Sequence, residues 1–158
     1  MSPITPRPVV VAAGGFVDVV SVNHYELLLG AHLWLPRITR AAHTRNALRE
    51  FHELAKRPVL VTEFGFRAVT DTHRSTSPPI FPRLDTQRAR GWRTWRYVRR
   101  MVQADYIVGY HLFEWFDQPL NGRRSGKENN NLDVVDLENR IYPAYVAYLR
   151  KANATVPD

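Results

Sequence analysis

The chain has 158 residues, of which 44% are hydrophobic, so it is long enough to bury a core and too apolar to be disordered. It contains no cysteine, which excludes disulfide bonds and thiolate metal sites and leaves the cellular compartment open. The formal net charge of +7 is typical of a solvated basic surface and, less often, of a protein that binds a polyanion such as nucleic acid.

Three strand-like stretches alternate with helical stretches. Residues 16–25, FVDVVSVNHY, are rich in valine and end in polar residues, which predicts a first strand. Residues 42–57 carry apolar side chains at helical spacing between charges, which predicts a first helix. The stretch VLVTEF at 59–64 predicts a second strand.

The second half of the chain continues this order. Residues 67–84 contain STSPPIFPR and predict a loop. A second helix is predicted at 86–104, a third strand at 106–116, and a last helix at 143–152 with a proline in its first turn.

The second helix is expected to bury an apolar stripe formed by Trp92, Trp95, Val98 and either Met101 or Val102. Its arginines are expected on a solvated outer face, and a site for nucleic acid or a sulfated polysaccharide is the alternative for that face. These arginines are Arg88, Arg90, Arg93, Arg96, Arg99 and Arg100.

Continuous apolar strands separated by helices are typical of a parallel sheet covered by helices, so the predicted fold class is α/β. Residues 1–15 are expected to be a linker or a truncated start, and residues 16–158 to form the domain. No apolar run reaches the length of a membrane span, and we expect no membrane partner.

Each predicted strand ends in polar or aromatic residues. The first ends in Asn23, His24 and Tyr25, the second in Glu63, and the third in residues 114–117. In parallel α/β folds, the chemistry collects at the carboxyl ends of the strands. Three consecutive ends of this kind predict the rim of an active site.

Each residue also has a purely structural interpretation. Glu63 could form a salt bridge to an arginine, and His24 could be an ordinary loop histidine. Tyr25 and Trp115 could be core aromatics with their polar tips at the surface. Side chains alternate along a strand, which separates His24 from Tyr25. The same alternation separates Glu114 from Trp115 and favours Trp115 for the site.

Three stretches together resemble the C-terminal part of a retaining glycoside hydrolase: PVLVTEFGF at 58–66, VGYHLFEWFDQP at 108–119 and ENNNLDVVD at 128–136. They are similar to β-agarase-like members, in which a loop of this kind follows the last strand. The resemblance covers about residues 16–152. It implies a partial (β/α)₈ (TIM) barrel, about the last three βα units, and carbohydrate as the partner.

The resemblance also implies roles for single residues. Glu63 matches the catalytic nucleophile, Tyr25 the tyrosine that hydrogen-bonds it, and Trp115 the aromatic floor under a sugar ring. Hydrogen bonds to a carboxylate favour the ionised form that a nucleophile needs. Further polar residues are expected to bind sugar hydroxyls, although an asparagine run by itself is typical of a turn. They are Asn23, His24, Asp117, Asn129, Asn130 and Asn131.

A retaining glycosidase needs a second carboxyl group, the acid/base, roughly 5 Å from the nucleophile. In the resembling clan this glutamate follows an asparagine, and no Asn-Glu pair precedes Tyr25. A full barrel takes about 250 residues. We therefore expect a fragment of a longer enzyme that is inactive alone. The alternatives are a non-catalytic remnant, assembly with a missing N-terminal barrel half or with itself, and a basic polyanion-binding module.

No cofactor and no metal ion are expected, and nucleic acid is the less favoured partner. The first ten residues, MSPITPRPVV, lack the basic segment and apolar core of a signal peptide. Localisation is left open, since this pattern is compatible with a secreted parent enzyme.

Overall fold

The computed structural model describes residues 5–25, 45–69, 75, 83–124 and 126–156. Contacts between Cα atoms divide the chain into two compact units. The first comprises residues 1–64 and 100–111, and the second residues 65–99 and 112–158.

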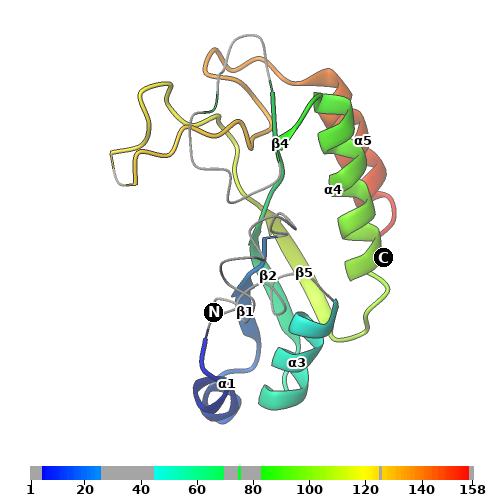
Figure 1. The fold of residues 1–158 in the computed structure, drawn as a ribbon. Helices are drawn as coiled ribbons and strands as arrows, with labels where there is room; N and C mark the ends of the chain where they lie inside the picture. Colours follow the sequence, from blue (N-terminus) through cyan, green and yellow to red (C-terminus); the bar gives the residue numbers. More distant parts are fainter. Residues whose placement is uncertain (1–4, 26–44, 70–74, 76–82, 125, 157–158) are drawn as a thin grey trace. The chain divides into compact units, whose positions relative to one another are not determined.

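The first unit contains a three-stranded sheet. Its elements are α1 (Arg7–Ala13), β1 (Val20–Asn23), α3 (Arg45–Ala55), β2 (Val59–Phe64) and β5 (Ile107–Leu112), the last belonging to this unit up to residue 111. The sheet order is β1-β2-β5 (Figure 1).

The strands of this sheet run parallel. β1 pairs with β2 in parallel, with Val20 opposite Val59. The backbone N–H of Val59, which begins β2, donates to the carbonyl of Tyr106, which directly precedes β5, at 2.8 Å. The starts of β2 and β5 therefore lie side by side, and the predicted parallel α/β arrangement is confirmed.

α3 packs on β1 and β2 and covers the first core. Alternate strand residues, Val20, Val22, Val59 and Val61, are buried. α3 buries its own apolar stripe against the core, as the helical spacing predicts. The buried residues of α3 are Ala47, Leu48, Phe51 and Ala55.

Residues 7–13 form a helix, although the sequence predicts a linker or truncated start there. Val10 is fully buried, and Arg7 forms a salt bridge to Glu50 of α3 at 2.8 Å. This segment has three consecutive valines and no helical pattern of polar residues, so its sequence did not signal a helix. Packing against α3 accounts for the difference.

The second unit contains two helices and a long polar segment. Its elements are β3 (Arg67–Ala68), β4 (Arg83–Leu84), α4 (Gln87–Met101, belonging to this unit up to residue 99) and α5 (Pro143–Asn153). β3 pairs with β4 in parallel. These short strands begin and end the predicted loop at 67–84, most of which lies outside the described residues.

α4 and α5 run in the same direction and pack closely. A Cβ atom added to Gly91 would lie 2.8 Å from the Cβ of Tyr148, so glycine permits the approach of the two helices. One turn further along, Lys151 of α5 lies over the ring of Trp95. The predicted helices are confirmed, with ends that differ by a few residues.

The predicted apolar stripe of α4 is wrong in part. Trp92 is 43% exposed, whereas Arg90, predicted on the outer face, is 0% exposed. Carbonyl groups of Asn131 and Asp133 accept hydrogen bonds from the buried guanidinium, and an arginine lies over the ring of Trp92 at the surface. Val98 and Met101 are buried as predicted.

Among the described residues, no helix combines the length and apolarity needed to cross a membrane.

Candidate active site

The carboxyl ends of β1 and β2 carry the best-defined part of the candidate site. The pairing register shifts after Val22, so that Asn23 lies opposite Glu63. The backbone N–H of His24 then donates to the carbonyl of Glu63 at 2.8 Å. This irregularity fixes the two strand ends against each other just where their polar residues begin.

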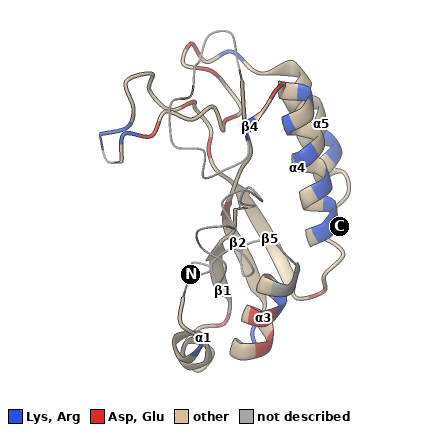
Figure 2. Ribbon diagram, viewed as in Figure 1, with Lys and Arg blue, Asp and Glu red and all other residues tan. Residues whose placement is uncertain are grey.

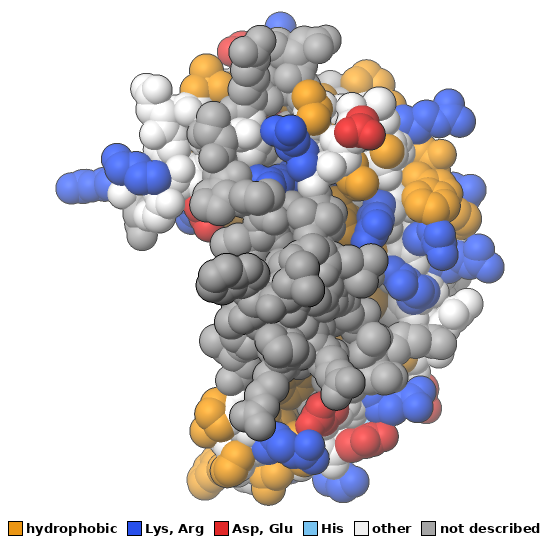
Figure 3. All heavy atoms as spheres, in the orientation of Figure 1, with side chains coloured by type: hydrophobic (Ala, Val, Ile, Leu, Met, Phe, Trp, Pro, Cys, Tyr) orange, Lys and Arg blue, Asp and Glu red, His pale blue; other side chains and the backbone are white. Residues whose placement is uncertain are grey.

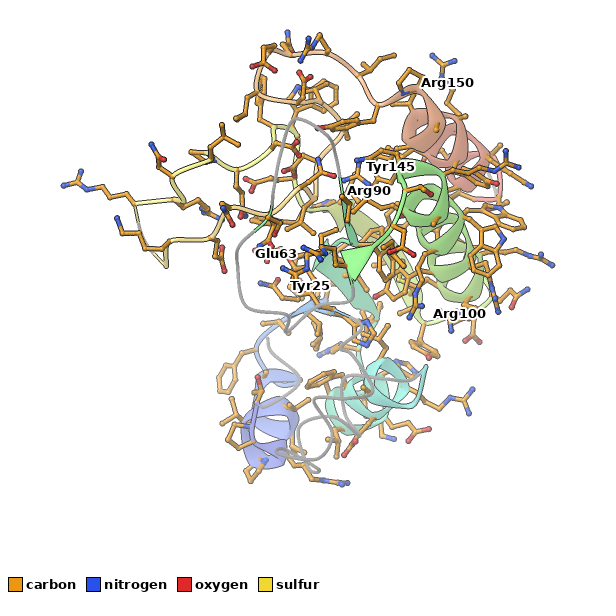
Figure 4. All side chains as sticks on the ribbon, turned by 45° about the horizontal axis from the view of Figure 1, so that its top comes forward. Tyr25, Glu63, Arg90, Arg100, Tyr145 and Arg150 are labelled. Atoms are coloured by element: carbon orange, nitrogen blue, oxygen red, sulfur yellow. The ribbon has the colours of Figure 1, made fainter. Side chains whose placement is uncertain are left out.

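Tyr25 follows the end of β1, and its hydroxyl donates to the Oε2 atom of Glu63 at 3.0 Å (Figure 4). Both side chains are half-buried. A hydroxyl that donates to a carboxylate stabilises its negative charge and restricts its rotation. The hydrogen bond that the family resemblance implies is therefore present, while the nucleophilic role of Glu63 stays a prediction.

Two further predicted residues lie in the same unit. The Oδ1 atom of Asn23 accepts a hydrogen bond from the hydroxyl of Thr62 at 2.9 Å. His24 is buried, so its ring belongs to the interior of the described structure. Sugar binding by Asn23 and His24 stays a prediction.

Trp115 and Asp117 belong to the second unit. The side chain of Trp115 is 59% exposed, and its backbone carbonyl accepts hydrogen bonds from the N–H groups of Val134 and Val135 at 3.1 Å each. An exposed indole on a fixed backbone suits stacking on the apolar face of a sugar ring. The role of Trp115 as an aromatic floor stays a prediction.

The asparagine run is buried rather than a solvated turn. Asn129 and Asn130 are each 3% exposed. The amide of Asn129 donates to the carbonyl of Leu120 at 3.2 Å. The Oδ1 of Asn130 accepts from Arg67 at 3.0 Å and from Ser75 at 3.1 Å. These bonds occupy groups that were expected to meet sugar hydroxyls, and sugar binding by Asn129 and Asn130 stays a prediction.

Asp117 is also held from within the second unit. Its Oδ2 atom accepts from the amide of Asn131 at 2.6 Å and from the hydroxyl of Tyr142 at 2.5 Å. Burial and the hydrogen bond to Asp117 raise the pKa of Tyr142. Tyr142 therefore remains protonated and donates to Asp117 at neutral pH.

A buried arginine, Arg90, lies next to this network, and its burial was not predicted from the sequence. Arg90 donates to the carbonyl of Asp133 at 2.6 Å and to that of Asn131 at 3.3 Å. Its guanidinium lies 3.6 Å from the centroid of the Tyr145 ring, and burial lowers the pKa of Arg90. In sequence, nothing distinguishes Arg90 from the other five arginines of α4.

Asp133 is the second residue that sequence reasoning missed, although it lies inside the ENNNLDVVD stretch. Burial raises the pKa of Asp133 to about 8. The backbone N–H of Glu114 donates to its Oδ1 atom at 2.5 Å and opposes this shift. Burial thus favours the protonated form of Asp133, whose Oδ1 atom fixes the backbone next to Trp115.

No group of three or more histidine, aspartate or glutamate side chains in the described part of the chain is arranged to hold a metal ion.

The chain is similar to known proteins over almost its whole length. It is 26% identical over 155 residues to β-agarase B of Vibrio sp. (strain JT0107), an alignment that covers 97% of this chain and 14% of that protein. The structure of an exo-β-agarase superposes with a TM-score of 0.71 at 30% identity, covering 94% of this chain and 18% of the other. No protein-family model matches the chain.

The fold has a further relative in the structure of PfGH50B, with a TM-score of 0.76 at 21% identity, covering 98% of this chain and 20% of that one. The sequence similarity to β-agarase B and the structural similarity to the exo-β-agarase show that the chain is similar to glycoside hydrolases. More narrowly, the chain is β-agarase-like, as its motifs predict. It spans less than a fifth of the length of β-agarase B and of the exo-β-agarase.

Proposed function

We propose that this chain supplies the nucleophile side of a retaining β-glycosidase that cleaves a polysaccharide, specifically a galactan of the agarose type. The hydrogen bond from Tyr25 to Glu63, at the carboxyl ends of adjacent parallel strands, is the observation that carries the proposal. The sequence similarity to β-agarases supports the choice of galactan.

In the proposed reaction, a carboxylate oxygen of Glu63 attacks the anomeric carbon and the glycosidic bond breaks, leaving a glycosyl ester on the enzyme. Tyr25 keeps the attacking carboxylate oriented. Water then cleaves the ester. In this proposal the chain forms about the last three βα units of a (β/α)₈ barrel, and Trp115 supports the sugar ring from below.

The leaving oxygen must receive a proton, and we assign that step to a carboxyl group outside this chain. Glu114 is a poor substitute, because its Oε1 atom already accepts from the amide of Gln118 at 3.2 Å. Arg123 also lies 3.9 Å from that oxygen. Either a longer form of the protein or a separate chain would carry the acid/base.

The proposal is tested with a substrate that needs no acid. 2,4-Dinitrophenyl 2-deoxy-2-fluoro-β-galactoside loses dinitrophenolate without protonation, and the fluorine slows hydrolysis of the ester that forms. We expect the 158-residue chain to release dinitrophenolate in one equivalent and to gain one fluorogalactosyl group. Peptide mass spectrometry should place that group on Glu63.

The matched control is Glu63→Gln, which keeps the size of the side chain and removes the nucleophile. This variant should gain no label. Label on another carboxylate, or no label on a chain whose circular dichroism shows that it is folded, would contradict the proposal.

A further inference from the structure

The excess positive charge of the chain is concentrated on α4 and α5 (Figure 2). Together these helices contain eight of the 22 lysines and arginines and none of the 15 aspartates and glutamates, which leaves 14 basic and 15 acidic residues elsewhere. The positive net charge of the chain therefore comes from these two helices.

One stripe of α4 carries both cations and indole rings. Positions 88, 92, 95, 96 and 99 recur at helical spacing and fall within about a third of the helix circumference. Lys151 of α5 extends the stripe, since its Nζ lies 3.9 Å from the ring centroid of Trp95. We call this surface the basic–aromatic face. It consists of Arg88, Trp92, Trp95, Arg96, Arg99 and Lys151.

Three cations of this face, Arg96, Arg99 and Lys151, lie over the indole rings. The Cζ atom of Arg96 lies 4.7 Å from the ring centroid of Trp92, and that of Arg99 lies 5.5 Å from that of Trp95. A guanidinium held over a ring keeps its N–H edges available for an anion. Among the described residues, the arginines at 88, 96 and 99 and the lysine at 151 form no ion pair with a carboxylate.

We propose that the basic–aromatic face binds an anionic polysaccharide, in which sulfate esters or carboxylates meet the arginines and a sugar ring stacks on Trp92. This surface is distinct from the residues proposed for hydrolysis, and its choice of polymer rests on the proposed function. Basic and hydrophobic side chains lie next to one another over the region of α4 in the space-filling view (Figure 3).

Two features favour a polysaccharide over a nucleic acid. Trp92 is 43% exposed and offers an apolar ring face beside the cations, as sugar C–H groups require. The similarity to β-agarases favours a galactan as the polymer, and the arginines favour anionic groups on it. Arginine binds the oxygens of a sulfate or carboxylate through paired N–H groups.

The test is affinity electrophoresis of the 158-residue chain in gels that contain a sulfated galactan, κ-carrageenan, or the same polymer after chemical desulfation. We expect retardation by the sulfated polymer only, weakening as salt is added. The double variant Arg96→Ala/Arg99→Ala should bind at least about tenfold more weakly, because each arginine loses charge-assisted hydrogen bonds. Trp92→Ala, made separately, should weaken binding with the net charge unchanged.

The matched control for charge is Arg49→Ala/Arg124→Ala, which removes two exposed arginines outside α4 and α5 and should leave the retardation unchanged. Equal retardation by the desulfated polymer, or by the control and double variants alike, would overturn the proposal. Tighter binding to duplex DNA of equal charge concentration would assign the face to nucleic acid instead. Glu63 takes no part in this readout, so a negative result here and a negative labelling result are separate findings.

Discussion

At the scale of single residues, Glu63 shows how a strand of apolar residues can end on a carboxylate. The charge is half-buried and receives a hydrogen bond from Tyr25 on the neighbouring strand end. An ionised group in such a position is costly unless a donor compensates it. Removal of the Tyr25 hydroxyl therefore tests this compensation directly.

We predict that Tyr25→Phe slows the labelling of Glu63 by about tenfold or more, because a hydrogen bond to a charged group is worth about 1.5–3 kcal/mol. The variant keeps the ring and its packing. The rate of dinitrophenolate release measures the effect. An unchanged rate would show that this hydroxyl group does not activate the carboxylate of Glu63 for attack.

Asp133 leads to a prediction about pH. Its pKa rises from 3.8 to about 8 on folding, so the folded chain holds more protons than the unfolded chain between these values. The free energy of unfolding contributed by this group therefore falls as pH rises through that window and levels off above it. Asp133→Asn should reduce the fall between pH 5 and pH 8.

Urea unfolding at several pH values measures this dependence. Asp105→Asn, at an exposed position, is the control and should keep the pH dependence of the parent chain. A parallel fall in Asp133→Asn and in the parent would contradict the assignment of this proton to Asp133.

At the scale of elements, α4 is held in the second unit by a buried cation. We predict that Arg90→Met destabilises the chain by about 3–5 kcal/mol, because the carboxylate of Asp117 loses its buried counter-charge and two carbonyl oxygens lose their donor. Arg88→Met removes the same charge from an exposed position two residues earlier and should cost less than about 0.5 kcal/mol. Denaturant midpoints compare the two variants.

The packing of α4 on α5 gives a second prediction at this scale. Gly91→Ala should destabilise the chain by about 1–3 kcal/mol, since the new methyl group would lie 2.8 Å from the Cβ of Tyr148, which cannot rotate away. The higher helix propensity of alanine, about 1 kcal/mol, offsets only part of this cost. Gly15→Ala, where the nearest atom would be 3.5 Å away, is the control.

The same elements show how much of the fold could be predicted from the sequence. β2 was predicted at 59–64 and is found there, because an apolar run after a proline is locally unambiguous. The stripe of α4 was predicted in part wrongly, because hydrophobic periodicity treats every tryptophan as buried and every arginine as exposed. Which arginine is buried depends on carbonyl and carboxylate groups more than 25 residues away, and these become neighbours only in the fold.

For the candidate site, the sequence predicted which polar residues end the strands. The family resemblance implied the hydrogen bond between Tyr25 and Glu63. The register shift after Val22, which joins those ends, has no signal in the sequence. Nor has the network around Asp117, whose partners come from separate segments.

At the scale of the whole molecule, we predict that the chain alone does not turn over agarose, agaro-oligosaccharides or simple aryl β-galactosides. General acid catalysis is worth about a hundredfold to ten-thousandfold, and we assign that group to a carboxyl outside this chain. Reducing-sugar release compares the chain with Glu63→Gln. Turnover abolished by Glu63→Gln would contradict this prediction. Activity restored by a separately produced N-terminal barrel half would identify the source of the acid.

The buried asparagine run also bears on the chemical ageing of the chain. Asparagines in mobile loops deamidate when the following backbone nitrogen attacks the side-chain amide, which needs local freedom. Asn129, Asn130 and Asn131 are buried and their amides are hydrogen-bonded, so they should resist this reaction while the second unit is folded. Deamidation of Asn131 would place a new carboxylate beside Asp117. The rate at which aspartate appears at 129–131 on storage would then measure how often this segment opens.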